Sequence, residues 1–358
     1  MLSQRLLRDF NGICFALSQR QQAKLAQKLS SEDLLKKPEQ KTKPLTHVLS
    51  VDVEDYFQVE AFAGSVDRKG WHQWPSRVVA NTHRVLDLFD QHNAKATFFF
   101  VGWIAERFPH LVREVQSRGH ELACHSYWHR TVYSLTPKEF REDTRQAKKA
   151  IEDATGTAVA GYRAPSWSIT KSCLWALDIL AEEGFTYDSS IFPIRHDLYG
   201  VPGAQRFPYT HACANGRKLR QFPPATLRLF GTNLPAAGGG YLRIFPSAFT
   251  ELAFRTFEQK YGERVVVYLH PWELDPEQPR IHGPLKSRLR HYTNLKHMHA
   301  KLNTVLSRRK FQAFQHLMAA EEAGGNRQAS LLDSSRIVID KNLSEPIHAM
   351  AHVAKGKR

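Results

Sequence analysis

A regular alternation of strand-like and helix-like segments runs from about residue 45 to residue 270 and limits the possible folds more than any other feature of the chain. Such units assemble into a mainly parallel sheet covered by helices. About seven strands in about 230 residues favour a (β/α) barrel, with an open doubly wound sheet as the alternative. The predicted strands span residues 48–53, 96–101, 121–124, 160–163, 185–188, 217–222 and 264–270, and the predicted helices span residues 78–92, 104–118, 136–154, 171–183 and 247–261.

The first predicted strand runs directly into three carboxylates, Asp52, Glu54 and Asp55. Its β-branched side chains fit a covered, pleated surface, so we expect the strand to be buried. A buried carboxylate without a partner costs several kcal/mol, roughly, or gives up its charge. A single acid at this place would be interpreted as a helix cap, but three together indicate a site.

Residues able to do chemistry also follow the other predicted strands. Because ligands of α/β folds bind at the carboxyl ends of parallel strands, we expect these side chains on one rim. Each has a plain structural explanation when taken alone, such as capping, a rim ion pair or aromatic packing. Their coincidence at strand ends favours a common site. The segments are His125-Ser-Tyr-Trp-His129, Arg163-Ala-Pro-Ser-Trp167, Asp188-Ser-Ser190 and His270-Pro-Trp272.

The spacing of two histidines predicts a metal site. On a helical turn His125 and His129 would share one face and could share a metal. Two histidines and one carboxylate form a common three-ligand set that leaves a position for water. Period-two alternation puts Asp52 and Glu54 on the same face of the strand, so one can hold the metal while the other takes a proton.

These residues suggest a hydrolase. A metal of this kind polarises a carbonyl and activates water, and hydrolysis also needs a base and an acid. We predict Asp52 as the base, oriented by Arg163, and His270 as the acid that protonates the leaving amine. Asp188 is predicted to hydrogen-bond His270 and keep it protonated. Trp167 would then form an apolar wall for an acyl group or a sugar face.

The order of these motifs, from about Leu45 to Trp272, resembles the polysaccharide deacetylases, carbohydrate esterase family 4. The HSxxH and RxPxW patterns carry most of the specificity. Further segments are similar to the exosortase-associated branch and extend the resemblance to about residue 315. They are VDVEDYF at residues 51–57, Gln221-Phe-Pro-Pro224, Gly238-Gly-Gly-Tyr241 with Arg243, and Arg290-His-Tyr-Thr-Asn294.

The resemblance implies a distorted (β/α)7 barrel and metal-dependent removal of N- or O-acetyl groups from a sugar polymer, often at N-acetylhexosamine. The branch suggests a role in extracellular polysaccharide synthesis. Carried over to this sequence, the resemblance implies a base at Asp52, metal ligands at His125 and His129, an orienting Arg163, an acid at His270 tuned by Asp188, and substrate contacts at Pro165, Trp167, Tyr241 and Tyr268.

Two positions depart from the family pattern. The family has two adjacent aspartates, base then ligand, whereas Asp52 is followed by Val53. The metal carboxylate is therefore either Glu54, which strand alternation favours, or Asp55, which a turn directly after the strand would favour. The second departure is Tyr268, which occupies the position where the family usually has a leucine that lines the acetyl pocket.

Composition sets the remaining limits. Net charge is +15, with +5 in residues 1–50, +10 in residues 280–358 and a neutral centre. Nucleic acid is therefore not expected, and the basic flanks are interpreted as solvated, with peripheral contact to an anionic membrane surface as the alternative. The four cysteines show no disulfide or zinc spacing. No membrane-length apolar run or clear signal-peptide core is present, which predicts a cytoplasmic protein.

We therefore predict a metal-dependent deacetylase of acetylated oligo- or polysaccharides. Zinc suits the donor set, as would cobalt, nickel or iron. The alternatives are an amidohydrolase acting on a small non-sugar molecule and a non-catalytic carbohydrate-binding protein. The expected parts are a basic extension and linker at residues 1–44, the catalytic barrel at 45–280, a basic helical extension at 281–320 and a disordered tail at 321–358.

Overall fold

The computed structural model describes residues 44–229, 231–236 and 238–323. The described residues up to Leu317 belong to one compact unit, and a second unit begins at Met318. The predictions made for residues 1–43 and for most of the tail lie outside the described residues. No helix in the described part of the chain is both long and apolar enough to cross a membrane.

One large sheet organises the first unit. Among the described residues, seven strands follow one another in parallel, in the order β10-β1-β2-β3-β4-β5-β7. Strand β6 pairs antiparallel with β7, and β11 pairs in parallel with the start of β1. The strands are β1 (Thr46–Val53), β2 (Thr97–Phe100), β3 (Glu121–Cys124), β4 (Gly161–Tyr162), β5 (Tyr187–Asp188), β6 (Tyr209–Ala212), β7 (Lys218–Gln221), β10 (Val266–Leu269) and β11 (Lys310–Gln312).

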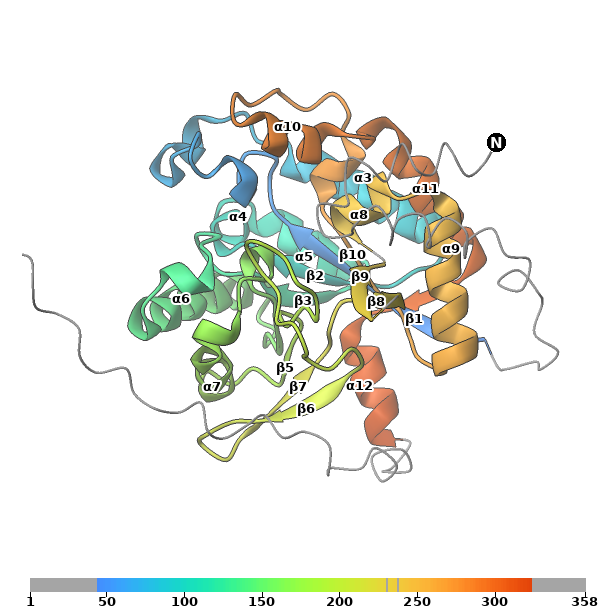
Figure 1. Ribbon diagram of the computed structural model, residues 1–358. Coiled ribbons are helices and arrows are strands. Elements are labelled where there is room, and N and C mark those ends of the chain that lie inside the picture. The colour runs from blue at the N-terminus through green and yellow to red at the C-terminus, as the bar shows by residue number, and fades with distance from the viewer. Residues whose placement is uncertain (1–43, 230, 237, 324–358) are drawn as a thin grey trace, which may run out of the picture. The chain divides into compact units, whose positions relative to one another are not determined.

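Helices connect the successive parallel strands except β5 and β7, which are joined through β6 without a helix, and Figure 1 shows α6 and α7 lying outside β3 and β5. The helices are α3 (Val78–Gln91), α4 (Gly102–Arg107), α5 (Pro109–Ser117), α6 (Pro137–Thr155), α7 (Trp175–Glu182), α8 (Gly239–Ile244), α9 (Ser247–Arg255), α10 (Leu285–Tyr292), α11 (Leu295–Arg308) and α12 (Phe314–Ala323). A separate hairpin is formed by β8 (Thr226–Leu229) and β9 (Thr232–Pro235). This topology confirms the predicted α/β distorted barrel.

The barrel is distorted because its sheet does not close evenly. Within the described residues, the outer edge of β10 makes only a single bridge, from Tyr268 to Gly238. On the other side of the sheet, β7 pairs with the antiparallel β6. Strand β1 lies between β10 and β2, and its residues from His47 to Val53 are all buried. The acid-tipped strand is therefore covered on both faces, as its apolar sequence predicts.

Several helices differ from their predicted form. The segment 104–118 is two helices, α4 and α5, because Pro109 cannot continue the first and instead begins the second. The segment 171–183 opens with a 3-10 turn before α7, and 247–261 ends in a π-helical turn after α9. By contrast, α6 begins with the predicted capping box between Thr136 and Glu139.

The segment after residue 280 does not stand apart from the barrel. Besides α10 and α11 it contributes β11, which pairs with β1 from Thr46 to Val48. Both helices contact barrel residues, as when Arg243 in α8 donates to the backbone oxygens of His291 and Thr293. This C-terminal segment therefore helps to build the site described next.

Candidate active site

Glu54, His125 and His129 come together at the carboxyl ends of β1 and β3. One potential ligand atom from each lies within 4.8 Å of the others, and all three residues are buried. Glu54 Oε2 lies 2.6 Å from His129 Nε2, and the two imidazole rings are 5.2 Å apart between centroids. A carboxylate and two imidazoles at this spacing form a three-donor set suited to a divalent cation.

The hydrogen bonds around these groups leave donor atoms aimed at a common point. His125 Nδ1 lies 2.7 Å from the backbone oxygen of Arg163, and because a carbonyl only accepts, Nδ1 carries the proton and Nε2 keeps its lone pair. Trp272 Nε1 donates to Glu54 Oε1, which fixes that carboxylate. Glu54 Oε2 is buried and faces His129 Nε2 at 2.6 Å, but it accepts no well-directed hydrogen bond among the described residues, an arrangement that a cation between the two atoms would satisfy.

The charges of the set also fit a cation. Burial opposes ionisation of Glu54, but His129 and His270 outweigh it and hold the pKa of the carboxyl well below its usual range. Burial lowers the pKa of His125 to about 4, so that the imidazole is neutral. The ionised Glu54 and the neutral His125 are in the protonation states that metal ligands require.

The histidine segment is not helical, which corrects the predicted basis for its spacing. Ser126 and His129 have φ values of 64° and 50°, so a compact loop brings the two imidazoles together. Asp143 of α6 holds this loop by accepting from Ser126 Oγ at 2.6 Å and from the backbone N–H of Tyr127 at 2.8 Å. The helix that follows the loop therefore fixes the histidine geometry.

Asp55, one of the predicted metal residues, does not face the histidines. Its Oδ2 accepts from Ser76 Oγ at 2.6 Å and from the backbone N–H groups of Arg77 and Val78 at 2.9 and 3.2 Å. Arg77, at the N-cap position of α3, makes no capping hydrogen bond with its side chain, so Asp55 satisfies these donors. The carboxylate is directed to α3 because the strand alternation that turns Glu54 inward turns the next residue away.

Replacing Asp55 with alanine should therefore destabilise the fold without emptying a metal site. We expect a loss of about 1–2 kcal/mol in unfolding free energy, since the start of α3 loses its capping acceptor. Denaturant unfolding would measure the loss, and metal analysis of the folded variant would give unchanged stoichiometry. Loss of metal from a folded Asp55→Ala protein would contradict this assignment.

Asp52 lies beside the triad and is held by a buried arginine. Arg163 Nη1 donates to Asp52 Oδ1 at 2.6 Å and to Ser50 Oγ at 2.9 Å. The guanidinium is fully buried, lies 4.2 Å from the ring centroid of Phe99, and also donates to Ser189 Oγ at 3.0 Å. Asp52 Oδ1 is thus occupied, while Oδ2 faces His270 Nε2 at 3.9 Å.

His270 meets Asp52 because their strands are paired. The register places Val51 opposite Leu269, so the next residue on each strand reaches the same end of the sheet. His270 Nε2 lies 3.5 Å from Glu54 Oε1, and its ring stacks on Trp272 with centroids 5.1 Å apart. Burial opposes protonation, but the surrounding carboxylates outweigh it and raise the pKa of His270 to about 9.

The carboxylate that orients His270 is Glu273 and not the predicted Asp188. Glu273 Oε2 lies 3.2 Å from His270 Nδ1, and Glu273 Oε1 accepts from Arg243 Nε at 2.5 Å. Burial opposes ionisation, but Arg243 and His270 lower the pKa of Glu273 to about 2. The short 3-10 turn Pro271–Leu274 brings Glu273 back over the histidine three residues earlier.

Asp188 instead organises the loop that holds Arg163. Its two oxygens accept from the backbone N–H and the hydroxyl of Ser190, at 2.9 and 2.5 Å. Ser190 Oγ in turn accepts from the backbone N–H of Ala164. Burial raises the pKa of Asp188 to about 7. Asp188, which was predicted to tune His270, therefore helps instead to position Arg163, the partner of Asp52.

Aromatic side chains form one wall next to these groups. Trp167, Phe192, Ile194 and Tyr268 make a buried cluster, with Tyr241 packed against it. The rings of Trp167 and Tyr268 lie 4.9 Å apart, and the guanidinium of Arg163 lies 4.7 Å from the Trp167 ring. Pro165, two residues before Trp167, is also buried.

Two glycines let the Tyr268 ring fit into this wall. A Cβ at Gly238 would lie 2.1 Å from the Tyr268 ring, and Gly238 and Gly239 have φ values of 151° and 50°. The hydroxyl of Tyr241 hydrogen-bonds that of Tyr199 at 2.8 Å. Gly238 and Gly239 thus leave the space that the Tyr268 ring occupies.

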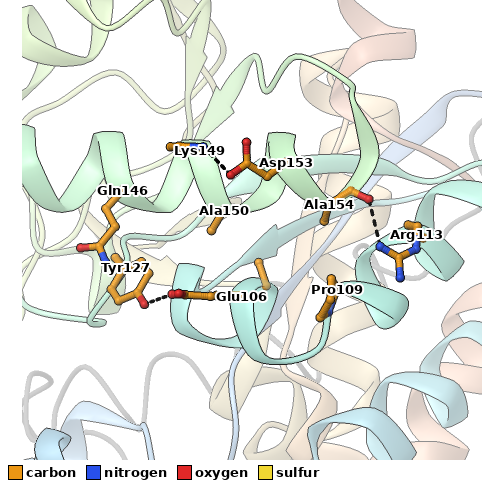
Figure 2. A pocket seen from close by; sticks show the side chains of 10 residues that line it. Glu106, Pro109, Arg113, Tyr127, Gln146, Lys149, Ala150, Asp153 and Ala154 are labelled. Atoms are coloured by element: carbon orange, nitrogen blue, oxygen red, sulfur yellow. Dashed lines mark hydrogen bonds and ion pairs between the residues drawn. The ribbon is translucent and has the colours of Figure 1, made fainter.

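Other clefts and clusters lie away from this rim. Figure 2 shows a pocket formed by α4, α5 and α6 and lined by Glu106, Arg113 and Lys149, on the outer side of the barrel. Tyr127 from the histidine loop reaches this pocket and donates to Glu106 there. Asp178, His211 and Cys213 form a second group of possible metal ligands, at α7 and the β6–β7 hairpin. Neither feature includes the rim residues.

Sequence reasoning did not assign roles to four side chains that orient the site. Trp272 and Arg243 were noted in the sequence without a role in orienting acids, and Asp143 and Glu273 were not noted. Glu273 had a signal, because an acid three residues after a histidine in a His-Pro-Trp-Glu turn can close back on it. Asp143 and Arg243 had none, since each acts across a long separation in the chain.

Comparison with known proteins identifies the segments around the site. Residues 70–187 match the family model described as polysaccharide deacetylase, and residues 189–319 match a domain of unknown function, DUF3473. A peptidoglycan deacetylase of Helicobacter pylori is 32% identical over 108 residues, which is 30% of this chain and 36% of that protein. A peptidoglycan-N-acetylglucosamine deacetylase of Bacillus cereus is 33% identical over 98 residues, 27% of this chain and 36% of that protein. The chain thus spans about a third of the length of these relatives.

A solved structure from Mycobacterium smegmatis, whose polysaccharide deacetylase assignment is itself inferred, aligns over 79% of this chain and 96% of that chain. Its sequence identity is 18% and its TM-score is 0.49. The family model and the curated relatives agree that this chain contains a segment of the polysaccharide deacetylase type.

The matched deacetylase segment holds only part of the site. His125, His129 and Arg163 lie inside it, whereas Asp52 and Glu54 precede it. The remaining groups, His270 and Glu273, lie in the segment that matches the domain of unknown function. The described fold brings all three parts to one rim.

Proposed function

We propose that this protein is a metal-dependent deacetylase that removes acetyl groups, above all from N-acetylhexosamine units, from a polysaccharide or its precursor. The observation that carries the proposal is the joint placement of two sets of groups at one rim. A carboxylate and two imidazoles form the cation set, and Asp52 and His270 lie directly beside it. The match of residues 70–187 to the polysaccharide deacetylases supports the acetylated sugar as substrate.

Glu54, His125 and His129 would hold the cation, which zinc, cobalt, nickel or iron could provide. When bound, a divalent cation lowers the pKa of water and polarises a carbonyl oxygen. Asp52 accepts the proton of the attacking water through Oδ2, since Arg163 occupies Oδ1. The hydrogen bond from Arg163 fixes the direction of the Asp52 carboxylate.

His270 completes the reaction by giving a proton to the leaving amine. Its Nδ1–H is directed to Glu273, which leaves Nε2–H facing the rim beside Asp52 and Glu54. The apolar wall of Trp167 and Tyr268 would exclude water around the acetyl methyl. Base and acid thus act from two neighbouring strands, β1 and β10.

Acetate release tests the activity. The purified protein, loaded with each of the four metals in turn, would be incubated with chitooligosaccharides, peptidoglycan fragments and an acetylated exopolysaccharide. We expect metal-dependent acetate release from at least one acetylated sugar. A folded, metal-loaded protein that releases no acetate from any of them would overturn the proposal and favour the small-amide alternative.

The Glu273–His270 pair predicts a specific pH response. A general acid works while protonated, so activity is lost as pH rises through the pKa of His270. Glu273 helps to raise that pKa to about 9, and a cation at Glu54 would weaken the contribution of that carboxylate. Replacing Glu273 with glutamine should therefore move the alkaline limb of kcat/KM to lower pH and reduce kcat about 10–100-fold. An unmoved alkaline limb in the folded variant would contradict the pairing.

We further place the enzyme in exopolysaccharide biosynthesis, as part of the exosortase-associated branch. Support comes from the motifs at residues 51–57, 221–224 and 290–294 that are similar to that branch. Deleting the gene should leave the acetyl content of the exported polymer higher than in the parent strain, as measured by NMR of the purified polymer. An unchanged acetyl content would remove this placement while leaving the activity itself open to the acetate assay.

A further inference from the structure

Helix α10 presents an unusual surface. Leu285 and Leu289 are 68% and 58% exposed, although leucines one turn apart on a helix normally face a core. The three cations of the same helix, Lys286, Arg288 and Arg290, are also exposed. The helix therefore shows solvent a mixture of leucine and positive charge over two turns.

A neighbouring loop extends this surface. Lys286 Nζ lies 3.8 Å from Asp197 Oδ2, which places the loop around residue 197 beside α10. The next residue in that loop, Leu198, is 53% exposed. Three of the four large apolar side chains that are exposed in the described part of the chain thus belong to α10 and this loop.

The surroundings of the surface are strongly cationic. Residues 278–320 contain nine lysines and arginines and no aspartate or glutamate. Some of these cations have acidic partners from earlier in the chain, as Lys286 has in Asp197 and Arg309 has in Glu251 and Glu258. The side chains of Lys286, Arg288 and Arg290 of α10 and of Lys296 of α11 are nevertheless exposed. A solvated face would not need the leucines, and an apolar protein partner would not need the cations.

The surface lies next to the candidate active site. His291, which follows the exposed cations of α10, stacks on Trp272 with centroids 4.1 Å apart, and Trp272 donates to Glu54. The residue before His291, Arg290, accepts a hydrogen bond at its backbone oxygen from Arg243, which also donates to Glu273 of the site. The exposed Leu285 and Leu289 therefore precede, by six and two residues, a histidine that contacts the rim.

We propose that the α10 surface, defined by Leu198, Leu285, Lys286, Arg288, Leu289 and Arg290, docks on an anionic lipid bilayer. Cations attract the surface of such a membrane, and leucines entering the boundary of the acyl chains add apolar contact that a soluble polyanion cannot offer. The contact holds the rim at the membrane surface. Lipid binding is independent of the proposed deacetylase activity and is measured without substrate.

Vesicle sedimentation of the full-length protein tests the proposal. We expect wild-type protein to bind phosphatidylglycerol-containing vesicles at low salt and not phosphatidylcholine vesicles. The Lys286→Glu/Arg288→Glu variant and the Leu285→Ser/Leu289→Ser variant should each bind at least about tenfold less at equal lipid. All four positions are exposed, so the variants should fold, and thermal melting would verify this.

Matched controls separate this surface from general charge. Lys138→Glu/Lys149→Glu makes the same charge change on α6, where the two side chains are 85% and 74% exposed, and Tyr133→Ser removes the other exposed apolar side chain. These controls should bind vesicles like wild type. If both α10 variants bind vesicles as well as wild-type protein does, bilayer docking is overturned. It is also overturned if the charge variant loses binding while the leucine variant keeps it. The latter result, with matching binding to dextran sulfate, would identify a polyanion surface instead.

Discussion

Replacing Asp52 with asparagine should lower kcat for acetate release by about 1,000-fold or more while the protein keeps its metal. Asparagine has nearly the same shape as aspartate but cannot accept the water proton at neutral pH. The bound metal is expected to stay because the cation set consists of Glu54, His125 and His129. Acetate release under saturating substrate and metal content by mass spectrometry would give the two quantities on one preparation.

The Asp52→Asn substitution should also lower the stability of the fold, and the experiment must separate this loss from the loss of turnover. Arg163 is fully buried against Asp52, so the variant leaves a buried guanidinium without its carboxylate and should lose about 3 kcal/mol of unfolding free energy. Asp55→Asn is a matched control, since it changes a buried acid of the same segment that faces α3. The control should keep both metal and turnover. If Asp52→Asn is folded but loses its metal, the base and the ligand have been interchanged.

Replacing His129 with alanine should empty the metal site. The three potential ligands are buried and converge from two strand ends, so removal of one imidazole leaves two donors and an unoccupied space. We expect metal content to fall from about one equivalent to near zero at micromolar free metal, and acetate release to fall at least about 1,000-fold. Adding excess metal should restore little activity.

Two further variants make the metal measurement specific. His110→Ala removes an exposed histidine of α5 and should leave metal content unchanged. Cys213→Ser removes one donor of the second group, formed with Asp178 and His211, and so separates any metal held there from metal held at the rim. A His129→Ala/Cys213→Ser protein that still holds one tightly bound equivalent would refute the proposed cation set.

Local patterns in the sequence were enough to predict the strand–helix order, the parallel sheet and most of the rim. Each of these depends on a short stretch of chain, such as the β-branched run of β1 or the cap at Thr136. The rule that parallel strands present their carboxyl ends together then placed Asp52, His125, Arg163 and His270 on one edge before any distance was known.

The hydrogen-bond partners of those residues could not be predicted from the sequence. Asp188 and Glu273 are both carboxylates near strand ends, and only the packing shows that one holds Ser190 while the other holds His270. Likewise the loop from His125 to His129 is shaped by Asp143, which comes from a later helix. Such contacts depend on how separate elements pack, and no local pattern encodes them.

The alternation of strands and helices that begins at β1 was thus enough, without the tertiary structure, to predict the architecture and most residues of the rim. Period-two alternation favoured Glu54 over Asp55 at the level of the sequence, and the tertiary structure supplied the reason by giving Asp55 to the start of α3. It also decided which acid orients His270 and which face of α10 is exposed. Backbone periodicity is a local property, whereas hydrogen-bond partners and exposure are settled only when distant segments pack together.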